Sequence, residues 1–115
     1  MKFKKVVISS FAYHLPDKIM TSGEIEDKLA PLYQRLNLPA GRLELMTGIK
    51  ERRFWSPGTR PSELSTQAAR NLFEKNIIKP GDIDLIIHAS VCRDFLEPST
   101  ASVVHCNLGL RPEAM

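Results

Sequence analysis

The sequence predicts an α/β fold in which helices pack against a mixed sheet, and three observations support this. Short aliphatic runs of strand character occur at residues 6–8 and 85–87, and neither is long enough to span a bilayer. Segments with helical start signals and an apolar face lie between and after them. The 115 residues are 43% hydrophobic and 25% charged, a composition typical of globular chains. Strands that alternate with helices favour largely parallel pairing.

The first strand is predicted at residues 4–10, where three aliphatic side chains (residues 6–8) run together as in a strand buried on both faces. A turn at Leu15-Pro16-Asp17 ends this segment, because a proline has no backbone N–H with which to extend a ladder. The chain is therefore expected to leave the sheet before the first helix.

The first helix is expected to begin near Ser22. Thr21 and Glu24 form a capping-box pattern, in which the hydroxyl accepts from the third helical amide while the carboxylate reaches back. Pro31 and Pro39 then divide the following segment into short helical pieces, since proline interrupts a helix interior.

The middle of the chain contains a strand, a longer helix and a second buried strand. Residues 49–55, after Gly48, have the character of a strand or an extended arm. Pro61 opens a second helix that ends before the turn at residues 79–82, and residues 83–89 form another buried strand. Apolar residues recur on one face of that helix: Leu64, Ala68, Ala69, Leu72 and Phe73.

The third helix is predicted to begin with Pro98 as its first residue, where the missing amide has no cost. It ends at Gly109, a residue suited to a left-handed C-cap. Residues 112–115 resemble the approach to one more strand. Three apolar side chains are expected to face inward: Ala101, Val104 and Leu108.

The charge and the aromatic content exclude several classes of function. The chain carries 16 Lys+Arg and 13 Asp+Glu, a net charge of +3, and its pI is near 9.0. With one Trp and two Tyr there is little aromatic surface on which bases could stack, so no nucleic-acid partner is expected. The phosphate-binding patterns GxGxxG and GxxxxGK[ST] are absent, and no cofactor is expected.

The cysteines and the start of the chain indicate a cytoplasmic protein without a membrane span. Cys92 and Cys106 do not make a disulfide framework, and no CxxC suggests zinc or dithiol exchange. The basic residues 2–5 precede a strand-like segment and not a secretory apolar region.

The candidate site is the loop of residues 90–99, because functional groups in α/β sheets gather past the carboxyl ends of strands. Glu97 lies beside apolar residues, and desolvation would strengthen its carboxylate as a proton acceptor. It also lies at a helix start, where the dipole favours the ionised form, so a capping or solvated carboxylate is the alternative.

The other reactive groups give weaker hypotheses. Cys92 could act as a nucleophile if His88 or His105 served as its base, although neither spacing enforces contact and His88 fits better as a hydrogen-bonded histidine near the core. His105 and Cys106 would point to different sides of one helix, which is poor ligand geometry even if Asp94 joined them, so no metal is expected.

The basic cluster Lys50, Arg52 and Arg53 has two possible roles. It could contact the phosphates of a ligand. The favoured alternative is a solvated arm that pairs with Glu44 or Glu51.

Taken together, several segments resemble the thiolase-superfamily condensing enzymes of the β-ketoacyl-ACP synthase III group. Leu15-Pro16-Asp17 and the run from Thr47 to Arg53 resemble the start of these enzymes. Residues 84–87, the Pro98-Ser99 helix start and residues 108–110 follow in the family order, so the resemblance covers essentially the whole chain. Within the group, residues 90–102 are most similar to the branch that makes long-chain olefins by joining two acyl-CoA chains without decarboxylation.

This resemblance implies a five-layer αβαβα fold of which residues 1–115 form the N-terminal part. It implies a homodimer that acts on acyl-CoA or acyl carrier protein substrates with Cys, His and Asn residues. All three belong to later parts of the family pattern, and the nucleophile would follow Met115, so the remainder of the chain or a complementary chain is needed. Alone, the chain is expected to be inactive.

The resemblance also gives Glu97 a role. Decarboxylating synthases have an apolar residue at this position, which reaches across the dimer into the partner's acyl site. In the olefin branch a glutamate there is the base proposed to deprotonate the α-carbon of an acyl chain. The chain departs from the synthases at Arg42 and Met46, which replace the Trp and Arg that contact the CoA nucleotide. An ordinary synthase III and a non-catalytic half-fold that pairs with another chain are the alternatives.

Overall fold

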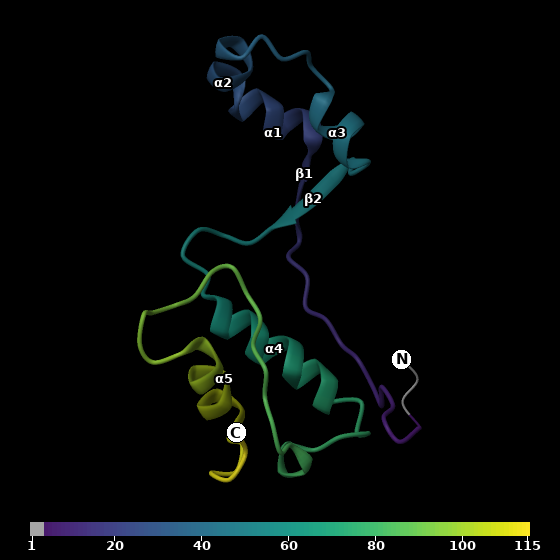
Figure 1. Cartoon of the computed structure of the whole chain (residues 1–115), viewed down its shortest axis with the longest axis vertical. Helices are drawn as coiled ribbons and strands as arrows, with labels where there is room; N and C mark the ends of the chain where they lie inside the picture. The colour runs from purple at the N-terminus through teal and green to yellow at the C-terminus, as the bar shows by residue number, and fades with distance from the viewer. Residues whose placement is uncertain (1–3) are drawn as a thin grey trace. The chain divides into compact units, whose positions relative to one another are not determined.

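The computed structural model describes residues 4–115, which form a mixed chain of helices and strands (Figure 1). The predicted α/β class is confirmed, whereas the predicted largely parallel pairing is wrong for residues 4–115, whose sheet is a two-stranded antiparallel one. A 3₁₀ turn, η1, lies at Pro80–Asp82. The strands and α-helices are, in chain order, β1 (Lys18–Thr21), α1 (Ser22–Lys28), α2 (Ala30–Arg35), α3 (Arg42–Thr47), β2 (Glu51–Phe54), α4 (Pro61–Phe73) and α5 (Thr100–Leu108).

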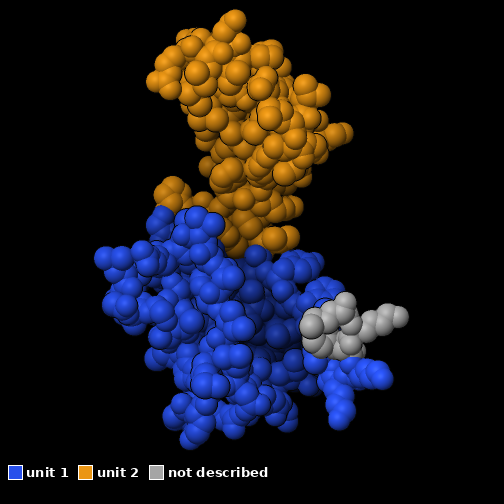
Figure 2. Space-filling view, in the orientation of Figure 1, with its two compact units in different colours: residues 1–14, 58–115 blue, residues 15–57 orange. Residues whose placement is uncertain are grey.

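The chain divides into two compact units, coloured separately in Figure 2. Unit 2 consists of residues 15–57 and contains β1, β2 and the three short helices. Unit 1 consists of the residues before 15 together with residues 58–115, and contains α4 and α5. Each unit has its own set of internal hydrogen bonds and is described separately below.

In unit 2, β1 and β2 form an antiparallel ladder that runs from the pair Lys18 and Phe54 to the pair Thr21 and Glu51. The extended segment predicted around residues 49–55 is therefore a strand. The Arg53 guanidinium donates to the carbonyl of Pro16 at 2.9 Å, which fixes the turn before β1 to the second strand.

The start of α1 confirms the predicted capping box. Thr21 Oγ1 accepts from the Glu24 N–H at 3.2 Å, and the Glu24 carboxylate accepts from the Thr21 N–H at 2.6 Å. Ser22, the first helical residue, is buried, and its hydroxyl donates to the carbonyl of Ile49 at 2.5 Å. The predicted division into short helical pieces is confirmed at Pro31, which lies in the first turn of a separate helix, α2.

Glycines bracket α3. Gly41, at its N-cap, has a φ of 80° and Gly48, at its C-cap, has a φ of 67°. Both angles lie in the left-handed region, which residues with a Cβ enter at a cost. The chain can therefore turn sharply into and out of this six-residue helix.

In unit 1, α4 and α5 pack against each other (Figure 1). Val104 of α5 is 2% exposed, and the Asn107 amide donates to the buried Thr66 hydroxyl of α4 at 3.2 Å. Helix α4 begins at Pro61 and ends before residue 79, as predicted. Its predicted apolar face is only half-buried, and its buried residues are Ser62 and Thr66.

The start of α5 differs from the prediction, whereas its end agrees. The first helical residue is Thr100 and not Pro98, because the Ser99 hydroxyl supplies the N-cap by accepting from the Ser102 N–H at 3.2 Å. Pro98 lies outside the helix, after a cis peptide bond. The predicted C-cap, Gly109, adopts a left-handed φ of 60°.

The two buried strands predicted at residues 4–10 and 83–89 are wrong for this structure. Among the described residues neither segment is part of a strand, and most of their aliphatic side chains are exposed: Ile8 is 89% exposed and Ile87 is 80% exposed. The aliphatic pattern describes how such segments pack within a complete sheet. A strand forms only where a neighbour accepts and donates ladder bonds.

Residues 84–86 nevertheless make one rung of parallel pairing with Met115. The Met115 N–H donates to the carbonyl of Asp84 at 2.9 Å, and the Ile86 N–H donates to the carbonyl of Met115 at 2.8 Å. This exchange around Leu85 is the hydrogen-bond pattern of a parallel ladder. The segment that the sequence predicted to approach a further strand, residues 112–115, thus pairs through Met115 with residues 84–86, a neighbour that the sequence analysis did not name.

The core of the described residues is small. Its buried apolar residues are Val104, Leu110 and Ala114 in unit 1 and Pro16 in unit 2. An apolar groove of about 190 Å³ adjoins them, lined by Ala69, Leu72, Phe73, Ile83, Leu85, Ile86, Ile87, Leu108 and Leu110. No helix within residues 4–115 has the length and apolar character needed to cross a membrane.

We predict that Thr21→Ala lowers the free energy of unfolding of unit 2 by about 1 kcal/mol, because the variant removes the acceptor at the start of α1. Chemical denaturation followed by far-UV circular dichroism measures the change. Thr21→Ser keeps the hydroxyl and is the control. Equal stability of all three proteins would contradict the role of the cap.

Candidate functional site

The candidate site is the loop of residues 90–99, called here the Glu97 loop, which leads from residues 83–89 into α5 in unit 1. The sequence predicted that the chemistry-bearing residues would gather in it. The structure shows that these residues have different tasks, since some hold the loop and others are exposed on it.

Asp94 holds the loop to the start of α4. Its Oδ1 accepts from the Ser62 N–H at 3.1 Å, while its Oδ2 is buried without a hydrogen-bond partner. Ser62 is 2% exposed, so its N–H has no access to bulk water. An unpaired buried N–H costs about 1–3 kcal/mol, and Asp94 prevents this loss.

Phe95 makes a second contact with the same end of α4. The Arg60 guanidinium lies over the Phe95 ring, 5.4 Å from the ring centroid, which is within the range of a cation–π interaction. Consecutive loop residues, Asp94 and Phe95, are thus both attached to the residues that begin α4.

Glu97 lies at the exposed end of the loop. Within residues 4–115, no hydrogen bond or ion pair holds its carboxylate, and the side chain is exposed. Leu96 next to it is 77% exposed, and Val91 in the same loop is fully exposed. Of the alternative roles for Glu97, the helix cap is wrong here, because Ser99 caps α5, whereas the exposed side chain agrees with a solvated carboxylate.

This arrangement offers a carboxylate with free lone pairs among exposed aliphatic groups. In water such a carboxylate is a weak base. A surface that covered Val91 and Leu96 would also take water away from Glu97, and a desolvated carboxylate accepts protons more readily. The described residues thus leave Glu97 and the neighbouring aliphatic side chains exposed together on this loop.

The predicted hydrogen-bonded role of His88 is confirmed. Its Nε2 lies 3.1 Å from the Ser65 hydroxyl of α4, and the side chain is half-buried. His105 Nε2 lies 3.2 Å from the carbonyl of Arg111. Both histidines are therefore engaged away from Cys92, which is exposed and free, as is Cys106.

No metal-binding cluster is present in the described part of the chain. Within residues 4–115, no three His, Cys, Asp or Glu side chains gather closely enough to hold an ion. Asp94, one of the ligand candidates considered from the sequence, is occupied with the start of α4.

The basic cluster of residues 50–53 contributes to the structure of unit 2. The Arg52 guanidinium donates to the Ser22 hydroxyl at 3.0 Å and to the Thr47 hydroxyl at 3.3 Å. Arg53 donates to a backbone carbonyl, as described above. The expected pairing with Glu44 or Glu51 is wrong for these two arginines, because nearby hydroxyl and carbonyl oxygens accept their hydrogens instead.

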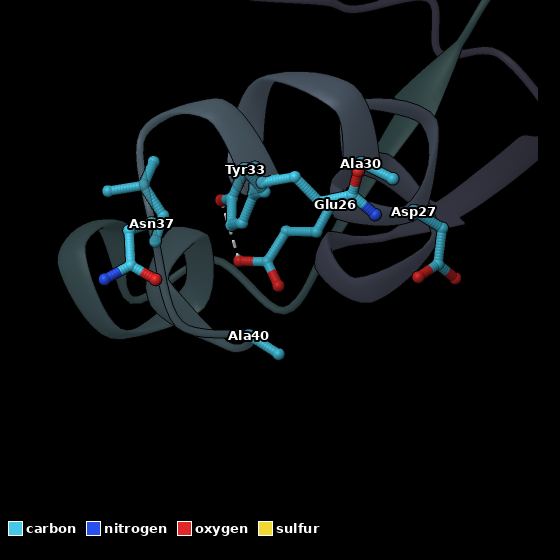
Figure 3. Close-up of a pocket in the computed structure, with 8 residues that line it drawn as sticks. Glu26, Asp27, Ala30, Tyr33, Asn37 and Ala40 are labelled. Carbon is cyan, nitrogen blue, oxygen red and sulfur yellow. Dashed lines mark hydrogen bonds between the residues drawn. The ribbon is translucent and has the colours of Figure 1, made fainter.

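A buried carboxylate, Glu26, organises the helices of unit 2. Its two oxygens accept from the Gly41 N–H at 2.7 Å, the Leu43 N–H at 2.6 Å and the Tyr33 hydroxyl at 3.0 Å. Figure 3 shows the Glu26 carboxylate and the Tyr33 hydroxyl turned toward each other. These bonds, led by the Leu43 amide, hold the pKa of Glu26 below its ordinary value.

A cavity of about 350 Å³ lies beside this carboxylate. Its lining residues are Glu26, Asp27, Ala30, Tyr33, Gln34, Asn37, Leu38 and Ala40. Because the oxygens of Glu26 are directed at protein donors, the cavity presents the exposed Asp27 carboxylate as its other charged group. Glu26 thus has a structural task, which is to join α1 to the start of α3.

Known relatives cover almost the whole chain. Acyl-CoA:acyl-CoA alkyltransferases of Shewanella oneidensis and Xanthomonas campestris pv. campestris are 38% identical over 110 residues and 40% identical over 115 residues. The alignments cover 96% and 100% of this chain but 32% and 34% of those enzymes. A β-ketoacyl-[acyl-carrier-protein] synthase III of Caldanaerobacter subterraneus subsp. tengcongensis is 38% identical over 96 residues, which is 84% of this chain and 27% of that enzyme.

Solved structures agree with the sequence comparison. The crystal structure of cerulenin-bound OleA from Xanthomonas campestris matches with a TM-score of 0.81 at 40% identity, and the match covers 94% of this chain and 31% of that one. An OleA variant with bound lauric acid and lauroyl-CoA matches with a TM-score of 0.79 at 40% identity, over 94% of this chain and 32% of that one. No protein-family model matches this chain.

The fold and the sequence thus define the class: the chain has the fold of the N-terminal part of a thiolase-like condensing enzyme. Within that class it is homologous to acyl-CoA:acyl-CoA alkyltransferases and β-ketoacyl-ACP synthases III, and the predicted resemblance is confirmed. The chain spans about a third of the length of the relatives it matches.

The sequence reasoning missed the structural tasks of Asp94 and Glu26. A signal was available, because neither Arg60 before α4 nor Gly41 before α3 has a side chain that can accept a hydrogen bond at a helix start. Such a helix needs an acceptor from elsewhere. The sequence does not say which carboxylate supplies it.

We predict that Glu26→Gln destabilises unit 2 at neutral pH. The amide nitrogen of Gln would face the N–H of Gly41 or Leu43, donor against donor. The hydrogen bonds lower the pKa of Glu26 from 4.5 in the folded state. The stability that the ionised carboxylate contributes is therefore fully present above pH 4.5 and is lost as the pH falls through the folded pKa. The difference between wild type and variant should therefore shrink on acidification, as measured by the Tm from pH 7 to pH 3.

Glu44→Gln is the matched control, because Glu44 is an exposed carboxylate in α3. Its Tm should follow that of the wild type across the same pH range. A Glu26→Gln protein as stable as the control at neutral pH would disprove the role assigned to Glu26.

Proposed function

We propose that this chain is the leading part of a cytoplasmic acyltransferase that joins acyl thioesters by Claisen condensation. Residues 1–115 would form one domain with the segments that complete the fold, and those segments would supply the Cys, His and Asn. The substrates would be acyl-CoA or acyl carrier protein thioesters, with no cofactor. The fold and the names of the homologous enzymes support this proposal.

In this proposal Glu97 is the base for a non-decarboxylative condensation across a homodimer. Its carboxylate removes a proton from the carbon next to the thioester carbonyl of one acyl chain. The carbanion attacks the carbonyl carbon of the second acyl group, held on the enzyme's cysteine. A C–C bond forms, the C–S bond breaks, and the electron pair leaves on the cysteine thiolate.

The observation that carries this role is the free Glu97 carboxylate on a loop whose neighbouring aliphatic side chains are exposed. A subunit that covered Leu96 would desolvate the carboxylate as well. Solved structures of Xanthomonas campestris OleA include variants in which a glutamate is replaced by aspartate or glutamine.

Within the same class, the alternative is a decarboxylating synthase that extends an acyl chain with malonyl-ACP. Loss of CO₂ then generates the carbanion, and no base at Glu97 is needed. Supplying the full-length protein with acyl-CoA alone, or with acyl-CoA and malonyl-ACP, distinguishes the two reactions. Product from acyl-CoA alone supports the non-decarboxylative reaction.

We predict that Glu97→Gln in the full-length protein lowers the rate of condensation of two acyl-CoA molecules by about 100-fold or more, because the amide cannot accept the proton. Acylation of the enzyme by the first substrate should continue at the wild-type rate. Product formation and acyl-enzyme mass are the two measurements.

The control is Glu113→Gln, since Glu113 is another exposed carboxylate of unit 1. It should leave both rates unchanged. Undiminished condensation by Glu97→Gln would refute Glu97 as the base.

A non-catalytic assembly module is the second candidate, and the exposed apolar side chains favour it. Val6, Val7 and Ile8 are all at least 69% exposed, as is Ile87. Such surface is usually covered in a stable complex. Sedimentation of the isolated chain tests this candidate: oligomers or capture of a complementary chain support it, and a well-behaved monomer contradicts it.

A further inference from the structure

The anchoring of the Glu97 loop depends on one carboxylate that the chemistry proposed above does not use. Asp94 precedes Glu97 by three residues, and its Oδ1 accepts from the Ser62 N–H at 3.1 Å. Its Oδ2 is buried without a hydrogen-bond partner. This carboxylate is therefore removed from water on one side and bonded to a helix on the other.

The start of α4 has no local substitute for Asp94. The N-cap residue, Arg60, carries a guanidinium, which can only donate hydrogen bonds. Pro61 has no N–H, so the first buried donor of the helix is that of Ser62. The carboxylate also interacts favourably with the positive end of the helix.

The loop is fixed on both sides of Glu97. On one side, Asp94 and Phe95 are attached to the start of α4. On the other side, Ser99 caps α5 and Thr100 is 5% exposed. Leu96 and Glu97 lie between these attachments and are exposed.

We propose that Asp94 is a positioning residue that sets the place of the Glu97 carboxylate by fastening the Glu97 loop to the amino terminus of α4. This inference rests on the proposed role of Glu97 as a base. Three residues of chain reach at most about 10 Å, so the anchor at Asp94 limits how far Glu97 can move from the start of α4.

A small displacement of a general base has a large effect on the reaction rate. A general base must come within about 2.6–3.2 Å of the atom whose proton it takes. A displacement of about 1 Å can slow a reaction about 100-fold. Loss of the Asp94 anchor should therefore lower the kcat for condensation and leave acylation of the enzyme, which does not use Glu97, unchanged.

The test compares Asp94→Ala, Asp94→Asn and the control Glu113→Ala in the full-length protein. Hydrogen exchange of the Ser62 amide and of residues 90–99 reports the anchor without reference to activity. In Asp94→Ala we expect exchange about tenfold faster or more, with condensation slowed between tenfold and about 100-fold at an unchanged rate of acylation. Asp94→Asn keeps an acceptor for Ser62 and should stay within about threefold of the wild type in both measurements.

Three results would overturn the proposal. They are unchanged exchange in Asp94→Ala, faster exchange with undiminished condensation, or an Asp94→Asn protein as impaired as Asp94→Ala. If Asp94→Ala does not fold, the proposal is judged on Asp94→Asn: exchange and condensation within about threefold of the wild type support it, and a larger loss overturns it. Condensation that survives Glu97→Gln would instead refute the proposed function, while the exchange data would still show whether Asp94 anchors the loop.

Discussion

Backbone N–H groups at the start of a helix have no partner within the helix, and at the starts of α3 and α4 carboxylates from distant segments accept their hydrogen bonds. Glu26 of α1 accepts from the Gly41 and Leu43 N–H groups at the start of α3. Asp94 accepts from Ser62 at the start of α4. Each bond joins two segments that are far apart in the sequence. In unit 2 the carboxylate unites three short helices, and in unit 1 it fastens the candidate site loop.

These carboxylates contribute to the internal structure of each unit, in which the buried apolar core is small. The buried apolar residues are few, and several buried residues are polar: Ser22, Glu26, Ser62, Thr66 and Thr100. Hydrogen bonds to charged groups are about twice as strong as those between neutral groups. Here these hydrogen bonds fix the positions of helices and loops, a task that the packing of an apolar core usually performs. The exposed aliphatic segments at residues 6–8 and 85–87 remain available for the neighbours that a complete thiolase-like sheet would provide.

Hydrogen bonding to a helix start also distinguishes the two carboxylates of the candidate site. Both Asp94 and Glu97 are carboxylates within one loop, and their residue types alone do not distinguish them. Their surroundings do, because Asp94 is bonded to a helix start and Glu97 has no partner among the described residues. A bonded, partly buried carboxylate is suited to hold structure, and a free one is suited to accept a proton. His88 follows the first pattern, since its bond to Ser65 occupies it within unit 1.

The sequence by itself determined the elements whose hydrogen bonds close within a few residues. The capping box at Thr21, the break at Pro31, the proline start of α4 and the C-cap at Gly109 are local, and each was predicted. The motif order also determined the relation to condensing enzymes. Only the tertiary structure decided that Glu26 and Asp94 cap helices they do not belong to, and that residues 4–10 and 83–89 are not strands here. The physical reason is that a ladder or a distant cap depends on its partner's position, which only the folded chain defines.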